Sequence, residues 1–208
     1  MSDPIRLSLW FAAHTGAQIL PRLAEAVAAV PQEARERGVN QFSVVALDWS
    51  EAAILDERTL PGTAVDPAAA IEAMRPFVQD DCACELELQW LLWTYGDSWT
   101  QTPQPLRITS FGPAFGGGAA RDEGQLAVDF GLDEAFLAES APWNKETRQR
   151  LQANIVQLLV YCRKVQEQLR PARRRLWSEG EGDWTEKLNQ RLRMASADAG
   201  HGSEALLQ

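Results

Sequence analysis

One stretch of the chain, CELELQWLLWTY (residues 84–95), constrains the fold more than any other. Its first half alternates apolar and charged residues, which is typical of a β-strand with one face on a core and one in solvent. Trp90 lies in phase with the apolar face, whereas Leu91, Trp93 and Tyr95 lie in phase with the charged residues. Burial contributes about 25 cal/mol per Å² of apolar surface, and a whole domain is stable by only about 5–15 kcal/mol. We therefore expect another segment or another molecule to cover these three side chains.

Residues 144–170 are the best candidate for this cover, because they predict a long helix with one apolar stripe. Apolar residues recur in a heptad pattern at Leu151, Ile155, Leu158, Cys162, Val165 and Leu169. Val156 and Leu159 are expected to widen that stripe. The heptad stripe, or an open sheet edge, would also serve self-association, so a homodimer is a separate expectation. A cofactor at this place would need convergent polar groups, and because the sequence offers few, we expect no cofactor.

The order of the predicted elements indicates an α+β fold. We expect strands at 5–13, 41–49, 52–60, 84–95, 106–115 and 124–137. A capping box at Thr15 and Gln18 precedes one helix, which would begin near Pro21 and end at Gly38, and a second helix would run from Asp66 to about Met74. These elements divide into two strand–helix–hairpin halves, with a faint echo between residues 46–55 and 127–137. We predict a mostly antiparallel sheet with these helices on one face and the long C-terminal helix partly covering the other face.

Charge divides the chain into two segments. Residues 1–142 contain 8 Lys and Arg against 21 Asp and Glu, a net charge of −13, whereas residues 143–208 contain 12 against 8, a net charge of +4. We expect an acidic α+β domain over 1–142 and a helical extension packed on it over 143–194. In that extension, ARRRLWSEGEGDW predicts a linker and TEKLNQRLRM one more short helix. Residues 195–208 are small and polar, and we expect a disordered tail there.

Composition disfavours several classes of protein. No apolar run approaches the roughly 20 residues of a membrane helix, and the N-terminus has no basic region before its short apolar run, so we expect a cytoplasmic protein. The three cysteines fit reduced thiols. The two histidines do not complete a zinc site with Cys82 and Cys84, so we expect no metal. The segment GPAFGGG (112–118) lacks the pattern of a phosphate-binding loop and predicts a hairpin loop instead.

Catalytic candidates are few. Asp48 and Asp129 each follow an apolar strand stretch, and on matching strands they could converge as a carboxylate pair for acid–base chemistry. The simpler interpretation is that each marks a strand end or a polar face. His14 is the only histidine in the predicted folded body, and a hydrogen bond at the start of the adjacent helix suffices to explain it.

A basic cluster follows the long helix, formed by Arg170, Arg173, Arg174 and Arg175. It could bind phosphate or an acidic protein. The simpler interpretation is a solvated helix end that interacts favourably with the helix dipole. Nucleic acid is an unlikely ligand, because phosphate contacts dominate that affinity and the chain has a net charge of −9.

The leading functional hypothesis is a non-catalytic protein-binding protein with an inhibitor, immunity or chaperone-like role. It depends on the acidic body, on the excess of aromatic residues, which include eight tryptophans, and on the lack of a catalytic motif. We expect the binding residues among Leu91, Trp93, Tyr95, Trp10 and Trp49. The alternative is a small-molecule sensor with an aromatic cleft between its two halves. An enzyme that uses Asp48, Asp129 or His14 is the third and least favoured hypothesis.

Overall fold

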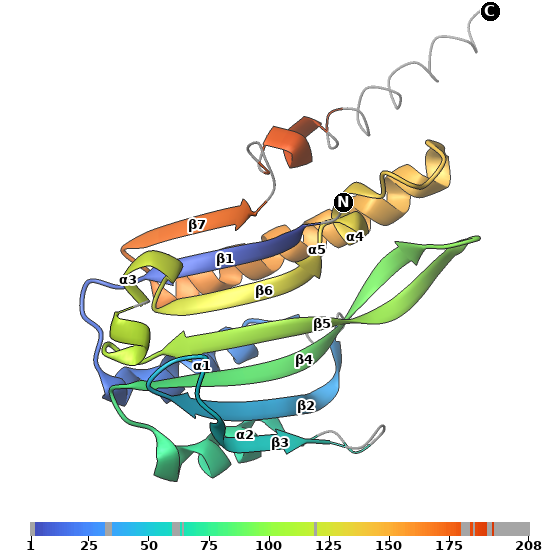
Figure 1. The fold of residues 1–208 in the computed structure, drawn as a ribbon. Coiled ribbons are helices and arrows are strands. Elements are labelled where there is room, and N and C mark those ends of the chain that lie inside the picture. The colour runs from blue at the N-terminus through green and yellow to red at the C-terminus, as the bar shows by residue number, and fades with distance from the viewer. Residues whose placement is uncertain are drawn as a thin grey trace, which may run out of the picture.

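The computed structural model describes residues 3–31, 35–59, 63, 65–118, 120–179, 184, 186–190 and 193. Seven strands form one sheet (Figure 1): β1 (Pro4–Trp10), β2 (Arg35–Ala46), β3 (Ala53–Arg58), β4 (Cys82–Tyr95), β5 (Trp99–Phe111), β6 (Leu126–Leu132) and β7 (Arg173–Ser178). Their order is β3-β2-β4-β5-β6-β1-β7, and all neighbours are antiparallel. The helices are α1 (Ile19–Ala28), α2 (Pro67–Met74), α3 (Ala120–Glu123), α4 (Glu134–Leu137) and α5 (Lys145–Leu169). The predicted α+β class, antiparallel sheet and long C-terminal helix are confirmed.

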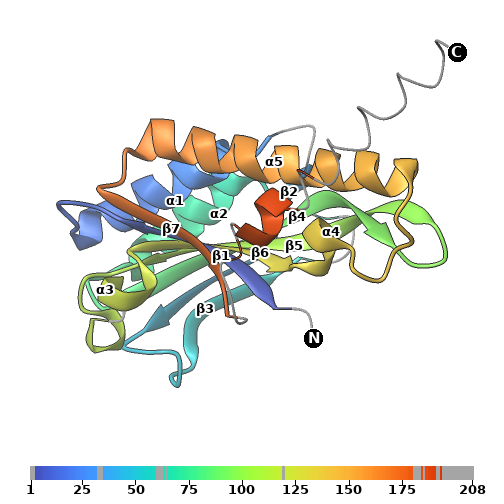
Figure 2. The ribbon, with the colours of Figure 1, turned by 90° about the horizontal axis from the view of Figure 1, so that it is seen from above.

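The three longer helices lie on the same face of the sheet (Figure 2), so the structure corrects the expected position of α5 on the opposite face. Tyr161 of α5 is fully buried between the layers, where its hydroxyl donates to the carbonyl of Ala26 in α1 at 3.3 Å. Its ring packs against Trp90 and Phe130 of the sheet. The reason is physical: the other face of the sheet presents charged side chains, and burying charges beneath an apolar helix is costly.

Helix α5 agrees closely with its prediction. The side chain of Asn144 accepts a hydrogen bond from the backbone N–H of Thr147 and caps the first turn, and Arg170 ends the helix with φ of 46°. The heptad stripe is buried in the core, except Leu169, which is half-buried. The stripe is therefore occupied within the chain, which leaves the sheet edges for the expected self-association. Val156 and Leu159 are exposed and do not widen the stripe.

Two helix starts follow their sequence signals. The capping box of Thr15 and Gln18 is formed and opens a 3₁₀ turn before α1. The carboxylate of Asp66 accepts from the N–H of Ala68 at 2.9 Å and caps α2. Helix α1 nevertheless begins two residues before Pro21, where a proline of the first turn disrupts no helical hydrogen bond, and it ends at Ala28. Gly38 does not end this helix but lies within strand β2 with φ of 94°.

The segment expected as a linker forms strand β7 instead, which pairs with β1 from Ile5↔Ser178 to Trp10↔Arg173. Three consecutive arginines conceal its alternation in the sequence. Trp184, from the end of the predicted linker, and Leu188, from the predicted last helix, are buried, and Trp184 contacts Phe136 with ring centroids 6.2 Å apart. The division of the chain at residue 142 stays a prediction, and the tail 195–208 lies outside the described residues. No helix in the described ranges is both long and apolar enough to cross a membrane.

Candidate binding groove on the open face of the sheet

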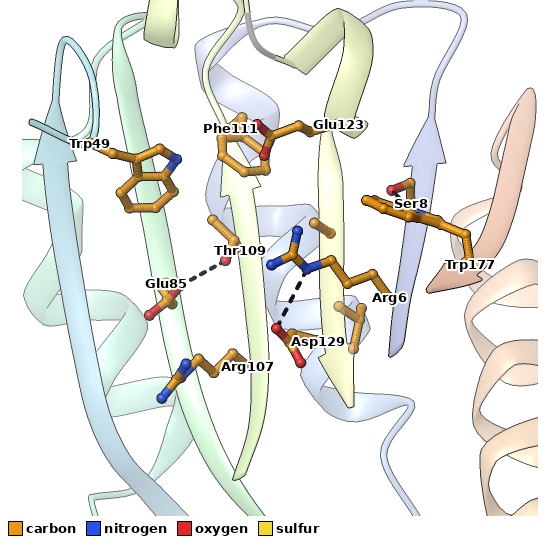
Figure 3. Close-up of a pocket in the computed structure, with 12 residues that line it drawn as sticks. Arg6, Ser8, Trp49, Glu85, Arg107, Thr109, Phe111, Glu123, Asp129 and Trp177 are labelled. Atoms are coloured by element: carbon orange, nitrogen blue, oxygen red, sulfur yellow. Dashed lines mark hydrogen bonds and ion pairs between the residues drawn. The ribbon is translucent and has the colours of Figure 1, made fainter. Parts of the chain in front are cut away.

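The face of the sheet opposite the three long helices holds a groove of about 230 Å³ (Figure 3). We call this hollow the open-face groove. It is lined by Arg6, Ser8, Trp49, Glu85, Arg107, Thr109, Phe111, Glu123, Ala127, Val128, Asp129 and Trp177. Apart from Glu123 of α3, the polar side chains come from adjacent positions on strands β4, β5, β6 and β1, because alternate residues of each strand point to this face. Glu85, from the charged phase that the sequence predicts for β4, thus lies in a concave surface.

Two arginines of the groove are paired with carboxylates. Arg6 lies 3.6 Å from Asp129, measured between Nε and Oδ2, and its Nη1 lies 2.7 Å from Glu179. Arg107 donates from Nε to Glu87 at 2.9 Å. Asp129 also accepts from the backbone N–H of Gly131 at 2.8 Å. These pairs hold both arginines at their strands and offset much of their positive charge.

Glu85 lies in a different environment. One oxygen of its carboxylate accepts a hydrogen bond from the Thr109 hydroxyl at 3.0 Å, and no lysine or arginine of the described residues forms an ion pair with it. Burial raises the pKa of Glu85, with smaller contributions from the like charges of Glu87 and Asp129, while Thr109 and Arg107 act in the opposite direction. The groove therefore contains a carboxylate whose ionised form a bound cation would stabilise.

Aromatic side chains form the two ends of the groove. Trp49 follows strand β2, and 49% of its surface is exposed. It makes edge-to-face contacts with Phe111 and Phe115, at centroid distances of 6.0 and 5.1 Å. At the other end, the indole N–H of Trp177 donates to the hydroxyl of Ser8 at 3.0 Å. Aromatic faces held in this way offer flat apolar surfaces that also attract cations.

The glycine-rich segment after β5 supports the Trp49 end. It forms a 3₁₀ turn from Phe115 to Gly117, and the N–H of Gly116 donates to the carbonyl of Leu47 at 2.6 Å. Leu47 has φ of 67° and turns the chain after β2. At Gly112, an added Cβ would collide with the backbone carbonyl of Asp80, so this position requires glycine. The segment thus positions an aromatic support for Trp49, where the sequence predicts only a hairpin loop.

The predicted aromatic binding residues separate into two groups. Trp49 lines the open-face groove, and Trp10 lies on the same face, where its indole N–H donates to the carbonyl of Arg121 at 2.8 Å. Leu91, Trp93 and Tyr95 lie outside the groove, on the far end of β4. There, all three are partly buried.

The predicted contact between the long helix and Trp93 is present. The guanidinium of Arg150 lies 3.6 Å from the centre of the Trp93 ring. Asn154 bonds both backbone groups of Trp93, accepting from its N–H at 2.9 Å and donating to its carbonyl at 2.8 Å. Among the described residues, β2 has no partner for β4 beyond Trp90, and the amide of Asn154 bonds the β4 backbone there. Helix α5 therefore covers this end of β4 from the core side of the molecule.

The catalytic candidates do not come together in one site. Asp48 lies in an exposed turn and accepts from the N–H and the hydroxyl of Ser50, at 2.7 and 2.5 Å. Asp129 is inside the groove, in the middle of β6. The Nε2 atom of His14 donates to the carbonyl of Phe111 at 2.5 Å, because Arg22 donates to Nδ1. Burial lowers the pKa of His14, and its hydrogen bonds are structural.

The thiols are buried rather than reactive. Burial raises the pKa of Cys84 to about 12 and that of Cys162 to about 12, and it also raises the pKa of Cys82. Within the described ranges, no three His, Cys, Asp or Glu side chains come together as metal ligands.

The predicted basic cluster is divided between α5 and β7. Arg170 is the C-terminal cap of α5, whereas Arg173 and Arg175 lie on the open face of β7, opposite Trp10 and Ser8 of β1. Sequence reasoning missed Glu85, Thr109, Arg107 and Trp177 as groove residues. Their signal was the alternation of β4 and β5, which identifies the polar face but not its hollow.

Comparison with known proteins gives no assignment: no protein-family model, no curated protein and no solved structure matches this chain significantly.

Proposed function

We propose that this chain is a non-catalytic binding protein that holds a basic segment of a partner protein in the open-face groove. In this proposal the Glu85 carboxylate binds the cationic group, and Trp49 packs against the apolar stem of the same side chain. The observation that carries the proposal is the position of Glu85. Its carboxylate is partly buried in the groove, bonded to Thr109 and next to two further carboxylates, with its ionised form disfavoured.

The balance of charge in the groove supports a cationic ligand. Arg107 is paired with Glu87, and Arg6 is paired with Asp129 and Glu179. Glu85 remains as a carboxylate without an arginine partner among the described residues. A ligand cation would complete the pattern, and the net charge of −9 would speed its approach.

The size of the groove favours one inserted side chain over a large ligand. Pockets for drug-sized molecules measure about 300–1,000 Å³, whereas the groove measures about 230 Å³. A lysine or arginine side chain fits this volume and buries its stem along aromatic surface. Under the small-molecule alternative, the ligand would have to be small and cationic, such as an amine or a guanidine. The three buried thiols, which form no disulfide, support a cytoplasmic location within this proposal.

Titration calorimetry with the peptide acetyl-GRRG-amide tests the proposal. We expect Glu85→Gln to weaken binding by about tenfold, the scale of one charge-assisted hydrogen bond. The matched control is Glu57→Gln, which changes net charge equally at an exposed position of β3 and should change affinity less than about twofold, as expected of an exposed charge.

Equal losses in the two variants would contradict the proposal, because they would indicate attraction by overall charge alone. Affinity for free agmatine equal to that for the peptide would replace it with the small-molecule alternative. Trp49→Ala supplies a second readout, since the proposal requires that this substitution also weakens peptide binding while Glu57→Gln does not.

A further inference from the structure

Strand β7 is one edge of the sheet. It pairs with β1 along six residues, and no strand of the described residues lies on its other side. Figure 1 shows β7 as the outermost strand beside β1. An open edge presents unpaired backbone N–H and carbonyl groups, which another extended chain can bind.

The arginines of this edge lie over aromatic rings. The guanidinium of Arg173 lies 4.4 Å from the centre of the Trp10 ring, and that of Arg175 lies 5.3 Å from the centre of the Trp177 ring. Among the described residues, no ion pair joins a carboxylate to either arginine. A guanidinium that lies over an aromatic ring keeps N–H groups available to bind an anion.

We propose that the β7 edge docks an acidic, extended segment of a partner protein by strand addition. Arg173 and Arg175 are two residues apart and lie on the same face of the strand. An added strand would therefore present acidic side chains at every second position, where each meets one guanidinium. Backbone hydrogen bonds supply affinity in this mode, and the alternate side chains supply specificity.

Two other occupants fit the edge less well. A second copy of the chain that paired β7 with β7 would bring like arginine charges together, which is destabilising. A nucleic acid would use the arginines but not the backbone groups of the edge, and the net charge of −9 would repel its phosphates. This inference is independent of the groove ligand, because it depends on Arg173 and Arg175 and not on Glu85 or Trp49, and on the opposite charge of the ligand.

The test uses the full chain and the peptide acetyl-VEVEVT-amide, with binding measured by titration calorimetry. We expect Arg173→Gln with Arg175→Gln to weaken binding at least about tenfold, because two charge-assisted contacts are lost. The matched control is Arg58→Gln, which removes an exposed arginine from the opposite edge strand β3. Methylation of alternate backbone nitrogens of the peptide should also abolish binding, since strand addition needs these N–H groups.

Three outcomes would overturn the inference: an equal loss in Arg58→Gln, full binding of the methylated peptide, or tighter binding of a single-stranded DNA oligonucleotide than of the peptide. A doubled mass in light scattering that the two β7 substitutions abolish would instead assign the edge to self-association. Circular dichroism and urea unfolding of the double variant verify that it is folded. The basic peptide acetyl-GRRG-amide tests the groove and the acidic peptide tests the β7 edge. A negative result with one peptide therefore does not decide the other proposal.

Discussion

The side chain of Asn154 offers the sharpest test of how the long helix holds the sheet. Asn154 lies in the middle of α5 and is fully buried. Its amide makes three hydrogen bonds to backbone groups: with the N–H of Trp93 at 2.9 Å, the carbonyl of Trp93 at 2.8 Å, and the carbonyl of Ala135 at 2.6 Å. One side chain thus connects α5 to the end of β4 and to α4. We predict that Asn154→Ala destabilises the fold severely.

The magnitude follows from the three lost bonds. A buried hydrogen bond contributes about 1 kcal/mol net, and each backbone group left without a partner costs about 1–3 kcal/mol. Water that enters the vacated space would form hydrogen bonds with some of these backbone groups and so lower the cost. We therefore expect a loss of about 3–5 kcal/mol in the free energy of unfolding, against a total of about 5–15 kcal/mol for a domain of this kind.

Asn144→Ala is the matched control, because it makes the same chemical change in the same helix. The Asn144 side chain accepts one capping hydrogen bond, from the backbone N–H of Thr147 in the first turn of α5. Such a cap contributes about 1 kcal/mol. The assay is urea unfolding followed by tryptophan fluorescence, with equal m-values required for the comparison. A loss for Asn154→Ala no larger than that for Asn144→Ala would refute the account of Asn154 as a link between α5 and the end of β4.

Three further predictions concern titratable groups. Burial raises the folded pKa of Glu85 above 4.5, so its ionised carboxylate lowers the stability of the fold at neutral pH, and this destabilisation disappears as the pH falls through the folded pKa. Glu85→Gln should therefore raise the free energy of unfolding at pH 7, and should raise it by less at pH 4. Because burial lowers the folded pKa of His14 below 6.5, stability should decline as pH falls from 6.5 toward that pKa, and His14→Gln should flatten this decline in urea titrations. Burial raises the pKa of Cys84 and that of Cys162 to about 12, so a thiol reagent at pH 8 should label neither residue until urea unfolds the chain. Rapid labelling in native buffer would contradict their burial.

Local signals in the sequence determine much of the fold. The heptad stripe predicts α5 over 144–170, against Lys145–Leu169 in the structure, and Asp66 with Pro67 predicts the start of α2. These features are predictable because a helix cap and a helical period act over a few neighbouring residues. The alternation of β4 likewise distinguishes its two faces on sequence grounds alone, with Trp90 in the core.

Features that depend on distant pairing were not predictable in the same way. Strand β7 pairs with β1 across more than 160 positions of sequence, as the bond from Trp177 to Ser8 illustrates. From the sequence, its three arginines are interpreted as the solvated end of the preceding helix, because no local property distinguishes an edge strand from a linker. The groove also depends on distant pairing. Glu85 and Thr109 lie side by side because β4 and β5 pair in one register, and Arg6 reaches the groove because β1 pairs with β6.

The two faces of the sheet differ in how their buried groups affect stability, and this difference supports the proposal that the open face binds a ligand. On the helix face, apolar burial stabilises the fold, and Tyr161 and Asn154 satisfy their polar groups within the chain. On the open face, Glu85 is buried enough to disfavour its ionised form, although its neighbour Arg107 is engaged by Glu87. A fold under selection for stability alone would gain from a neutral residue at this position, as many natural sites gain from replacement of a strained functional group. The charge at Glu85 is a cost that the fold itself does not need, and the binding of a cation is the interaction that would offset it.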